Sequence, residues 1–475
     1  MYFKTNPYMT RNIIRKILIL LFAAALALPA GAGPVYAAQR PELTLRAEAA
    51  ILLEADTGKV LYAKNEREKL YPASMTKIVT AMVLLDYFKP EELITVGGEV
   101  NHMPPGSSVA DIKEGETLTV ENLLRALIIP SGNDAGCVVA QAVAMRAKPD
   151  ENMTFDQVEK IFAGLMNDKA KALHASDTHF TNPHGYQDKD HYTTAYDMGL
   201  LARGAMAYPL LRKVVAEKSF SGPGAGENPP AGTVSRNYSW ESHNLLLEGE
   251  QYAYPYATGI KTGFTDEAGQ CLAASAETGG VALISVIMKD EDPYRWTDSI
   301  TLLDFGFHYF GNEAIQAAGQ QVDKVLLSNP QKGEPLTMPV NGAEDASAYL
   351  GLDEVPQVRH TIEYDSTLVV PNENPQDTDI YLRTPIEAGQ VVGTITYILN
   401  GETLYTGPVK AARAAEAGGF VNSLAYSAKH LFGSGKGIIY VVVGIAVFAF
   451  LILLLMVGRM RRRYRRNAYR LNKRY

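Results

Sequence analysis

One serine and one lysine of the chain are spaced as acyl-transfer chemistry would require. The stretch Y-P-A-S-M-T-K, residues 71–77, contains the only S-x-x-K in the chain and precedes an apolar run. On a helix, side chains three positions apart share a face, so Ser74 and Lys77 would lie close together. Serine becomes a nucleophile when a base takes its proton, and a charged lysine cannot be that base. The spacing therefore indicates either a nucleophile beside a neutral amine or a solvated surface pair.

A second lysine could lower the pKa of the first. The only K-T-G in the chain begins at Lys261, on a predicted strand. A nearby cation, a helix N-terminus and burial all disfavour the charged form of Lys77. Lys261 and Thr262 could bind a carboxylate, and Gly263 would let an extended substrate backbone lie against the strand. Taken alone, K-T-G is better explained as a turn after a short strand.

The third motif is S-x-N, which is weak because it occurs three times, at residues 131–133, 235–237 and 242–244. We select Ser131 and Asn133 because this copy follows one predicted helix, opens another and falls between the other two motifs. Taken alone, Ser131 would be interpreted as a helix N-cap.

Strands at both ends of a helical region must bring these motifs together. Residues 49–55 and 59–64 alternate around a D-T-G turn, which predicts a hairpin. Short β runs at 260–265, 270–276 and 281–288 would join that hairpin in one antiparallel sheet. The predicted helices are 74–88, 119–129 with Thr119 as N-cap, 131–147 and 155–172, and residues 221–232 are predicted to form a loop. Short alternating runs at 322–327, 360–370, 378–383 and 390–399 predict a small all-β domain.

Together, the motifs follow the order S-x-x-K, S-x-N, K-T-G, the set described for penicillin-binding proteins and serine β-lactamases. Over roughly residues 49–409 the chain resembles the D-alanyl-D-alanine carboxypeptidases, the low-molecular-mass penicillin-binding proteins. Further matching segments are E-G-E-T-L-T-V-E-N-L-L at 114–124, T-N-P-H-G at 181–185, T-A-Y-D-M at 194–198 and P-I-E-A-G-Q-V-V-G-T at 385–394.

The resemblance implies an α/β (α+β) serine penicillin-binding/β-lactamase-like catalytic domain, with a central antiparallel sheet flanked by helices and a small all-β C-terminal domain. The implied reaction removes the terminal D-alanine from a peptidoglycan stem peptide ending in D-Ala-D-Ala, and β-lactam antibiotics would be inhibitors. The implied roles are Ser74 as nucleophile, Lys77 as base, Ser131 as proton relay, Asn133 as a ligand of the substrate amide, Lys261 and Thr262 as carboxylate ligands, and the backbone N–H groups of Ser74 and Phe264 as oxyanion hole.

Three rival functions use or keep the same residues. A DD-endopeptidase acting on cross-links would look the same in sequence. A class A β-lactamase would carry an E-x-x-L-N segment, which is missing from this sequence. A non-catalytic wall-binding protein would be expected to have lost Ser74, Lys77 or Lys261.

We expect no cofactor and no metal, because neither H-E-x-x-H nor C-x-x-C spacing occurs. We expect His184, in a tight N-P-H-G turn, to be structural, and Cys137 and Cys271 to be buried thiols.

The two ends of the chain predict export and anchoring. Residues 1–37 combine a basic start, a short apolar stretch and V-Y-A, which predicts a signal peptide cleaved after Ala37. Residues 438–457 carry no charge and are long enough to span a bilayer as a helix. All nine charges of residues 458–475 are positive, which predicts a cytoplasmic tail, an extracytoplasmic catalytic domain and a single-pass cell-membrane protein.

The exported body is strongly acidic. Of 45 Lys and Arg side chains, four lie in the signal peptide and nine in the tail, while all 52 Asp and Glu side chains lie between, so the body carries a net charge of −20. This charge argues against nucleic acid as a partner. The expected organisation is signal peptide 1–37, catalytic domain 38–318, all-β domain 319–410, juxtamembrane spacer 411–437, transmembrane helix 438–457 and basic tail 458–475.

Overall fold

The computed structural model describes residues 40–150, 152–370 and 379–419, together with six helical residues between 447 and 459. These residues form two compact units that divide at Phe310 and Gly311. The division falls a few residues before the boundary expected at 318/319, because β10 (Phe310–Gln316) pairs with β13 (Ala346–Gly351). The predicted signal peptide and most of the predicted membrane segment lie outside the described residues. Within the described part of the chain, none of the helices has the length and apolar character needed to cross a membrane.

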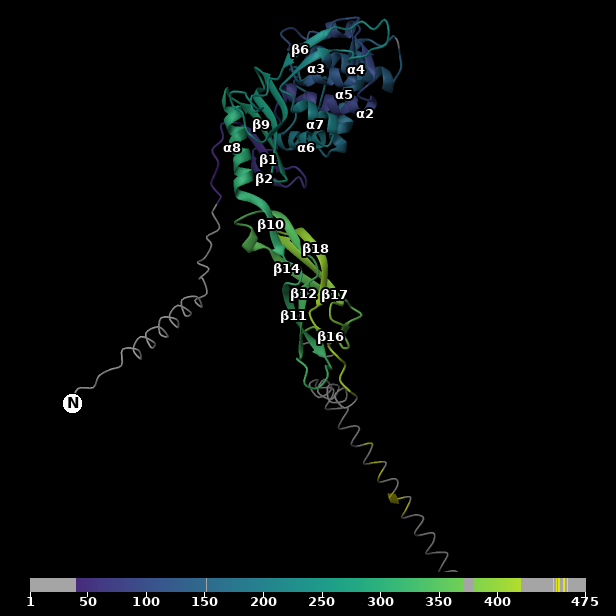
Figure 1. Cartoon of the computed structure of the whole chain (residues 1–475), viewed down its shortest axis with the longest axis vertical. Helices are drawn as coiled ribbons and strands as arrows, with labels where there is room; N and C mark the ends of the chain where they lie inside the picture. Colours follow the sequence, from purple (N-terminus) through teal and green to yellow (C-terminus); the bar gives the residue numbers. More distant parts are fainter. Residues whose placement is uncertain are drawn as a thin grey trace, which may run out of the picture. The chain divides into compact units, whose positions relative to one another are not determined.

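A five-stranded antiparallel sheet forms the centre of the first unit (Figure 1). The order is β2-β1-β9-β8-β7, so strands from the start and the end of this unit are neighbours, as the sequence predicted. The bounds are β1 Ala49–Glu54, β2 Val60–Lys64, β7 Ala257–Thr265, β8 Gly269–Thr278 and β9 Val281–Asp290. Every residue of β1 is buried, because helices cover both faces of the sheet. β7 is an edge strand, which leaves one side free to pair with an extended peptide.

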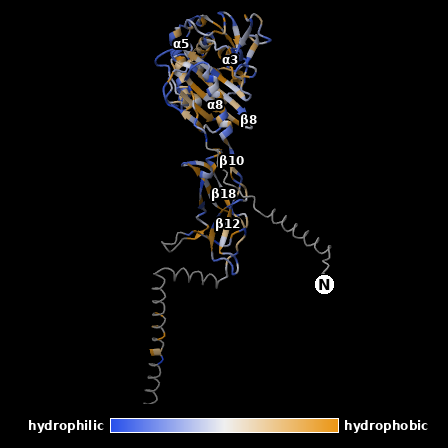
Figure 2. Ribbon diagram, turned by 90° about the vertical axis from the view of Figure 1, so that its left-hand side faces the viewer, coloured by the Kyte–Doolittle hydropathy of each residue, from blue (hydrophilic) through white to orange (hydrophobic). Residues whose placement is uncertain are grey.

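Helices pack on opposite faces of this sheet. Gly306 of α8 (Tyr294–Tyr309) lies against Leu52 on one face, and Gly199 of α6 (Ala195–Met206) lies against Leu53 on the other. Neighbouring residues of a strand point to opposite faces, so the two helices enclose β1. The remaining helices are α2 Lys77–Tyr87, α3 Val120–Ile128, α4 Asn133–Ala147, α5 Phe155–Ala172 and α7 Pro209–Val215. Apolar residues, orange in Figure 2, run along the strands between these layers.

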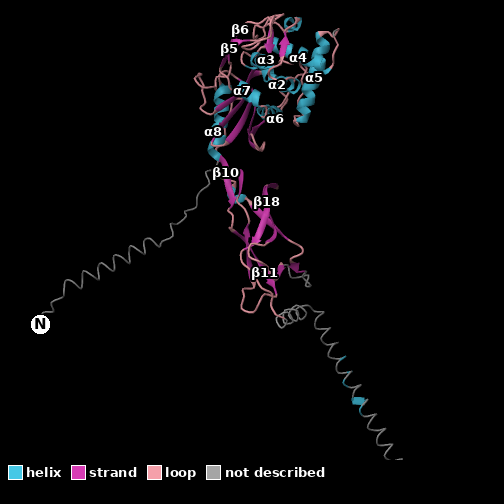
Figure 3. Cartoon of the chain, turned by 45° about the vertical axis from the view of Figure 1, so that its right-hand side comes forward, coloured by secondary structure: helices cyan, strands magenta, loops and turns pink. Residues whose placement is uncertain are grey.

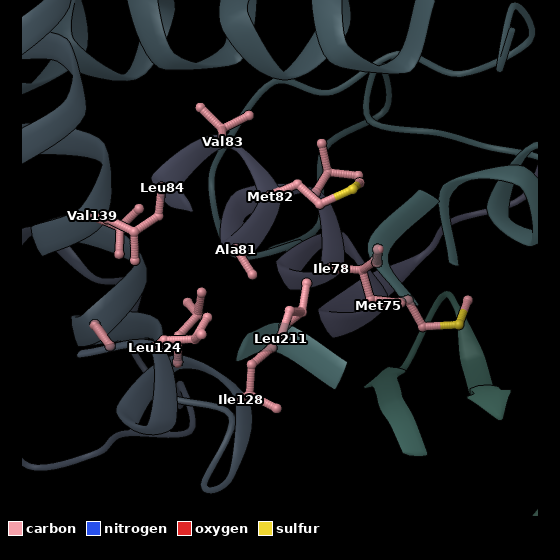
Figure 4. Close-up of a cluster of buried hydrophobic side chains, with 14 of the residues drawn as sticks. Met75, Ile78, Ala81, Met82, Val83, Leu84, Leu124, Ile128, Val139 and Leu211 are labelled. Carbon is pink, nitrogen blue, oxygen red and sulfur yellow. The ribbon is translucent and has the colours of Figure 1, made fainter. Parts of the chain in front are cut away.

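α2 is buried on all sides from Lys77 to Leu84, which is the position of a central core helix. Figure 4 shows its apolar side chains among residues of the surrounding helices, including Leu124 of α3, Val139 of α4 and Leu211 of α7. This packing places the N-terminal end of α2, which carries Lys77, deep in the protein.

Most predicted elements of this unit are present, and three differ. The predicted helix 74–88 starts with a 3-10 turn, η1 (Ala73–Thr76), before α2. The predicted helix 131–147 begins at Asn133, so its N-cap is Gly132 and not Ser131. The first residues of the predicted loop 221–232 form a strand, because β5 (Ser219–Pro223) pairs with β6 (Asn237–Glu241). Thr119 caps α3 as predicted, with its side chain accepting from the Asn122 N–H.

The second unit is built from strands, magenta in Figure 3. Its seven-stranded sheet has the order β14-β17-β18-β12-β11-β16-β15 around its own apolar core. The bounds are β11 Gln321–Ser328, β12 Thr337–Gly342, β14 Arg359–Tyr364, β15 Val369–Val370, β16 Tyr381–Arg383, β17 Val391–Leu399 and β18 Glu402–Ala411. The short elements not yet given are β3 Leu93–Thr95, β4 Thr117–Thr119 and η2 Gly98–His102 in the first unit, and η3 Val355–Gln357 in the second. The predicted all-β domain is therefore confirmed.

Candidate active site

The S-x-x-K motif forms a tight turn at the buried start of α2. Ser74 lies in η1, and Lys77 is the first residue of α2 and has no exposed surface. The Lys77 amine lies 2.9 Å from Ser74 Oγ, 2.6 Å from Asn133 Oδ1 and 3.0 Å from the His184 carbonyl oxygen. Ser74 and Lys77 therefore meet as the sequence predicted, and the surface-pair alternative is wrong.

These three contacts suit the Lys77 amine in either protonation state. A neutral amine has two N–H donors and one lone pair, whereas an ammonium has three donors. Asn133 Oδ1 and the His184 carbonyl can only accept, so they take two N–H groups. In the ammonium the third N–H donates to Ser74 Oγ, and in the neutral amine the lone pair faces the Ser74 hydroxyl instead. The neutral form can therefore take the hydroxyl proton on Nζ without any movement of the side chain.

The environment lowers the pKa of Lys77 well below its usual value. Burial is the largest cause, and the charge of Lys261 comes second, while Asp134 acts in the opposite direction. From the sequence, the charge of a second lysine was expected to be the main cause of a lowered pKa at Lys77. The structure assigns the larger effect to desolvation, because the core around α2 excludes water from the amine.

The S-x-N motif lies at the start of α4. The Asn133 amide is fixed in one orientation, because Nδ2 donates to Ser107 Oγ at 2.8 Å while Oδ1 faces Lys77. Ser131 is buried with a left-handed φ of 59°. Its hydroxyl has no hydrogen-bond partner among the residues that the structure describes, and it lines the cleft above Ser74. Ser131 is thus available to a ligand instead of capping α4.

The K-T-G motif lies on edge strand β7 beside the turn of Ser74. Lys261 and Thr262 are buried, and burial together with the charge of Arg295 lowers the pKa of Lys261 to about 7. A Cβ on Gly263 would lie 2.7 Å from the Pro72 carbonyl oxygen and 3.2 Å from the Ser74 nitrogen. Position 263 therefore requires glycine because β7 packs closely against the turn that carries Ser74. The sequence alone did not reveal this reason.

A cleft of about 530 Å³ opens over these residues. Six of the eight predicted site residues line it: Ser74, Ser131, Asn133, Thr262, Gly263 and Phe264. Lys77 and Lys261 are not on its surface and are buried. The described residues contain no group of three or more His, Cys, Asp or Glu side chains that could hold a metal ion.

Among the other residues that line this cleft, Arg295, His243 and Ser107 were not selected in the sequence. Arg295, at the start of α8, donates from Nη1 to the Gly263 carbonyl oxygen at 3.4 Å, and it lines the cleft with His243 and Ser107. Burial is the largest cause of the lowered pKa of His243, and the charges of Lys261, Lys77 and Arg295 lower it further. His243 is the middle residue of the S-x-N copy at 242–244, which was set aside, and no motif marks Arg295 or Ser107. Only the folding of distant segments places the three beside K-T-G.

His184 contributes through its backbone. Its ring is buried, Nδ1 accepts from the Tyr186 N–H at 3.2 Å, and burial and the charge of Lys77 hold its pKa well below the usual value. The ring thus supports the N-P-H-G turn, in agreement with the structural role expected. The carbonyl oxygen that orients Lys77 was not anticipated.

Comparison with known proteins identifies the family. The sequence matches the family D-alanyl-D-alanine carboxypeptidase over residues 35–292 and the family Penicillin-binding protein 5, C-terminal domain, over residues 312–417. It is 30% identical over 394 residues to the D-alanyl-D-alanine carboxypeptidase DacF of Bacillus subtilis, covering 81% of this chain and 89% of the relative. It is 31% identical over 385 residues to DacC of Escherichia coli, covering 79% and 85%.

The fold matches a solved structure of the same kind. The D-alanyl-D-alanine carboxypeptidase DacD from Francisella tularensis superimposes with a TM-score of 0.57 at 24% identity, covering 83% of this chain and 98% of that one. Sequence, fold and the Ser74–Lys77 geometry agree. The chain belongs to the D-alanyl-D-alanine carboxypeptidase family of low-molecular-mass serine penicillin-binding proteins.

Proposed function

We propose that this chain is a serine carboxypeptidase that removes the terminal D-alanine from peptidoglycan stem peptides ending in D-Ala-D-Ala. The observation that carries the proposal is the environment of Lys77: a buried amine with two acceptors on its N–H groups and Ser74 Oγ at 2.9 Å. Such an amine is a general base already in place beside its nucleophile.

Acylation would begin at Ser74. Its Oγ attacks the carbonyl carbon of the D-Ala–D-Ala bond while its proton moves to Lys77 Nζ. The backbone N–H groups of Ser74 and Phe264 stabilise the oxyanion. When the intermediate collapses, the C–N bond breaks and the proton on Lys77 passes through the Ser131 hydroxyl to the departing amine. This leaves an acyl ester on Ser74, free D-alanine and a neutral Lys77.

Recognition of the substrate terminus would fall to the cationic end of the cleft. Thr262 and Arg295 line the cleft, and Lys261 lies beneath it with a pKa near 7. A substrate carboxylate next to Lys261 favours the charged form of the amine and raises that pKa. The side chain of Asn133 would hold the substrate amide, and the free edge of β7 would pair with the peptide backbone.

Deacylation would use the same groups in reverse order. Water takes the place of the departed D-alanine, gives one proton to Lys77 and attacks the ester carbonyl, and Ser74 leaves with a proton from that amine. A β-lactam would acylate Ser74 through the same attack, but its ring nitrogen stays attached to the acyl group. Water therefore reaches the ester less easily, and the adduct persists.

We also propose that the chain is exported and held in the cell membrane, with the catalytic domain outside. This rests on the basic, apolar and small-residue pattern of residues 1–37, the charge-free stretch 438–457 and the all-positive tail. Protease added outside intact cells should digest the catalytic domain and leave a tag on residue 475 intact. Loss of that tag in intact cells would contradict the orientation.

The function is tested with the purified full-length chain. It should release D-alanine from a peptide ending in D-Ala-D-Ala and should be labelled by a fluorescent penicillin, with the adduct located on Ser74 by mass spectrometry. Ser74→Ala should abolish both, whereas Ser176→Ala, a change at an exposed serine, should keep both. Labelling that survives in Ser74→Ala would refute the nucleophile assignment. Rapid turnover of penicillin would favour a β-lactamase. Cleavage of cross-linked peptide dimers without release of terminal D-alanine would favour an endopeptidase.

A further inference from the structure

A buried histidine outside the three motifs contacts the nucleophile turn. His191 is 2% exposed and belongs to a segment tied to its neighbours on both sides. The backbones of Thr193 and Leu70 exchange two hydrogen bonds, at 2.8 and 2.9 Å, and those of Tyr192 and His179 exchange another two. Leu70 precedes Ser74 by only four residues. The histidine is therefore held rigidly against the segment that carries the nucleophile.

The hydrogen bonds of His191 define its tautomer. The backbone N–H of Thr181 donates to Nδ1 at 3.0 Å, so Nδ1 carries no hydrogen. Burial lowers the pKa of His191 to about 3, so the ring is neutral at physiological pH and its single hydrogen is on Nε2. Nε2 lies 2.8 Å from Thr76 Oγ1 and is therefore the donor in that pair.

The direction of this hydrogen bond decides the next one. Because Thr76 Oγ1 accepts from His191, its own hydrogen is free to donate to the Ala73 carbonyl oxygen at 2.8 Å. His191, Thr76 and Ala73 are buried, so the two hydrogen bonds that join them are shielded from water, while Thr181 is half-buried. The result is a series of three hydrogen bonds that all run in the same direction: Thr181 donates to His191, His191 donates to Thr76, and Thr76 donates to the Ala73 carbonyl.

Ala73 is the residue that needs such support. It has a φ of 46°, in the left-handed region, although it carries a Cβ, and it immediately precedes Ser74. A non-glycine residue in this region costs on the order of 1–3 kcal/mol and persists only when its surroundings hold it there. Gly185 packs against the same carbonyl, since a Cβ there would lie 1.8 Å from the Ala73 oxygen. The carbonyl is thus held between Gly185 and the Thr76 hydroxyl.

We infer that His191 is a positioning residue for the reaction, which acts through Thr76 and the Ala73 carbonyl to hold the strained turn that aims Ser74 at the substrate carbonyl and at Lys77. The inference rests on the proposed function. It assigns no contact between His191 and the substrate, because a hydrogen bond to Thr76 occupies Nε2 and one from Thr181 occupies Nδ1.

The experiment compares matched variants of the full-length chain. Thr76→Val keeps the shape of the side chain and removes the hydroxyl, whereas Thr76→Ser keeps the hydroxyl. His191→Leu removes both ring nitrogens, whereas His191→Gln keeps a donor for Thr76. Thr119→Val removes the N-cap of α3 and serves as a control for destabilisation of about 1 kcal/mol without contact with this turn. Acylation by a fluorescent penicillin and D-alanine release are measured per folded molecule.

Thr76→Val and His191→Leu are expected to lower the acylation rate constant and kcat roughly 10- to 100-fold with little change in KM, because the binding groups stay in place while the nucleophile is misplaced. Thr76→Ser and His191→Gln should recover most of the rate, and Thr119→Val should keep it. In the wild-type chain labelled with ¹⁵N-histidine, NMR should show His191 with its hydrogen on Nε2.

Two results would overturn the inference: wild-type rates in Thr76→Val and His191→Leu, or a hydrogen on Nδ1 of His191. If the valine or leucine variant does not fold, the NMR result on the wild-type chain still tests the direction of the hydrogen bonds, and a hydrogen on Nδ1 still overturns the inference. Absence of acylation in the wild-type chain itself would instead refute the proposed function.

Discussion

Gly263→Ala offers a direct test of how closely strand β7 and the turn that carries Ser74 depend on each other. The added Cβ would lie 2.7 Å from the Pro72 carbonyl oxygen, 3.2 Å from the Ala73 Cβ and 3.2 Å from the Ser74 nitrogen. Two of these three neighbours are backbone atoms, and the third is fixed to the backbone. None can move aside by a simple change of rotamer, so the turn itself must move.

The size of the effect follows from these distances. Ordinary contact begins at 3.4 Å, so the turn and the strand must separate by about 0.7 Å at Pro72. Overpacking of a buried site of this kind destabilises by about 1–3 kcal/mol. A misplacement of 1 Å can cost about 100-fold in rate, so we expect acylation of Ser74 to slow by roughly 10-fold or more.

Stopped-flow acylation with a fluorescent penicillin and thermal unfolding measure the two effects separately. Gly164→Ala is the matched control, because a Cβ there meets no atom within 4 Å and the residue lies inside helix α5. That control should acylate at the wild-type rate with equal or slightly higher stability. Wild-type acylation in Gly263→Ala at an unchanged melting temperature would refute the close coupling of strand and turn.

Two further predictions follow from the pKa shifts. The kcat/KM for a peptide with a free carboxylate should fall as pH rises above about 7, because Lys261 then loses the charge that binds the carboxylate. A pH profile of Lys261→Arg, whose side chain stays charged, should lack this decline, and a decline of unchanged position would assign it to another group. Neither cysteine should react with Ellman's reagent in the native chain, because both are buried and burial raises the pKa of Cys271 to about 11 and that of Cys137 to about 12. Both should react after denaturation, and a reactive thiol in the native chain would contradict the burial.

Local sequence patterns predicted the elements well where the signal is local. Alternation and the D-T-G turn identified the β1–β2 hairpin, and Thr119 was identified as the cap of α3 from its type and position. The same reasoning was wrong for Ser131, which has the side chain of an N-cap but precedes the true cap, Gly132. Ser131 has a left-handed φ of 59°, and the N–H of Gly132 bonds back to the Ala126 carbonyl oxygen of α3, so this turn depends on how α3 ends and not on the motif of three residues alone.

The sequence by itself determined the inventory of the site: one serine and lysine a helical turn apart, one K-T-G, and an S-x-N between them in chain order. Spacing along a helix or strand is a local property, so residue order alone decides which of these side chains share a face. Only the tertiary structure decided how these groups behave. The lowered pKa of Lys77, the hydrogen-bond chain from His191 and the arrival of Arg295 beside Gly263 all require segments far apart in sequence to pack together and exclude water. Desolvation and long-range contact arise only on folding, and they convert a common pair of residues into a reactive one.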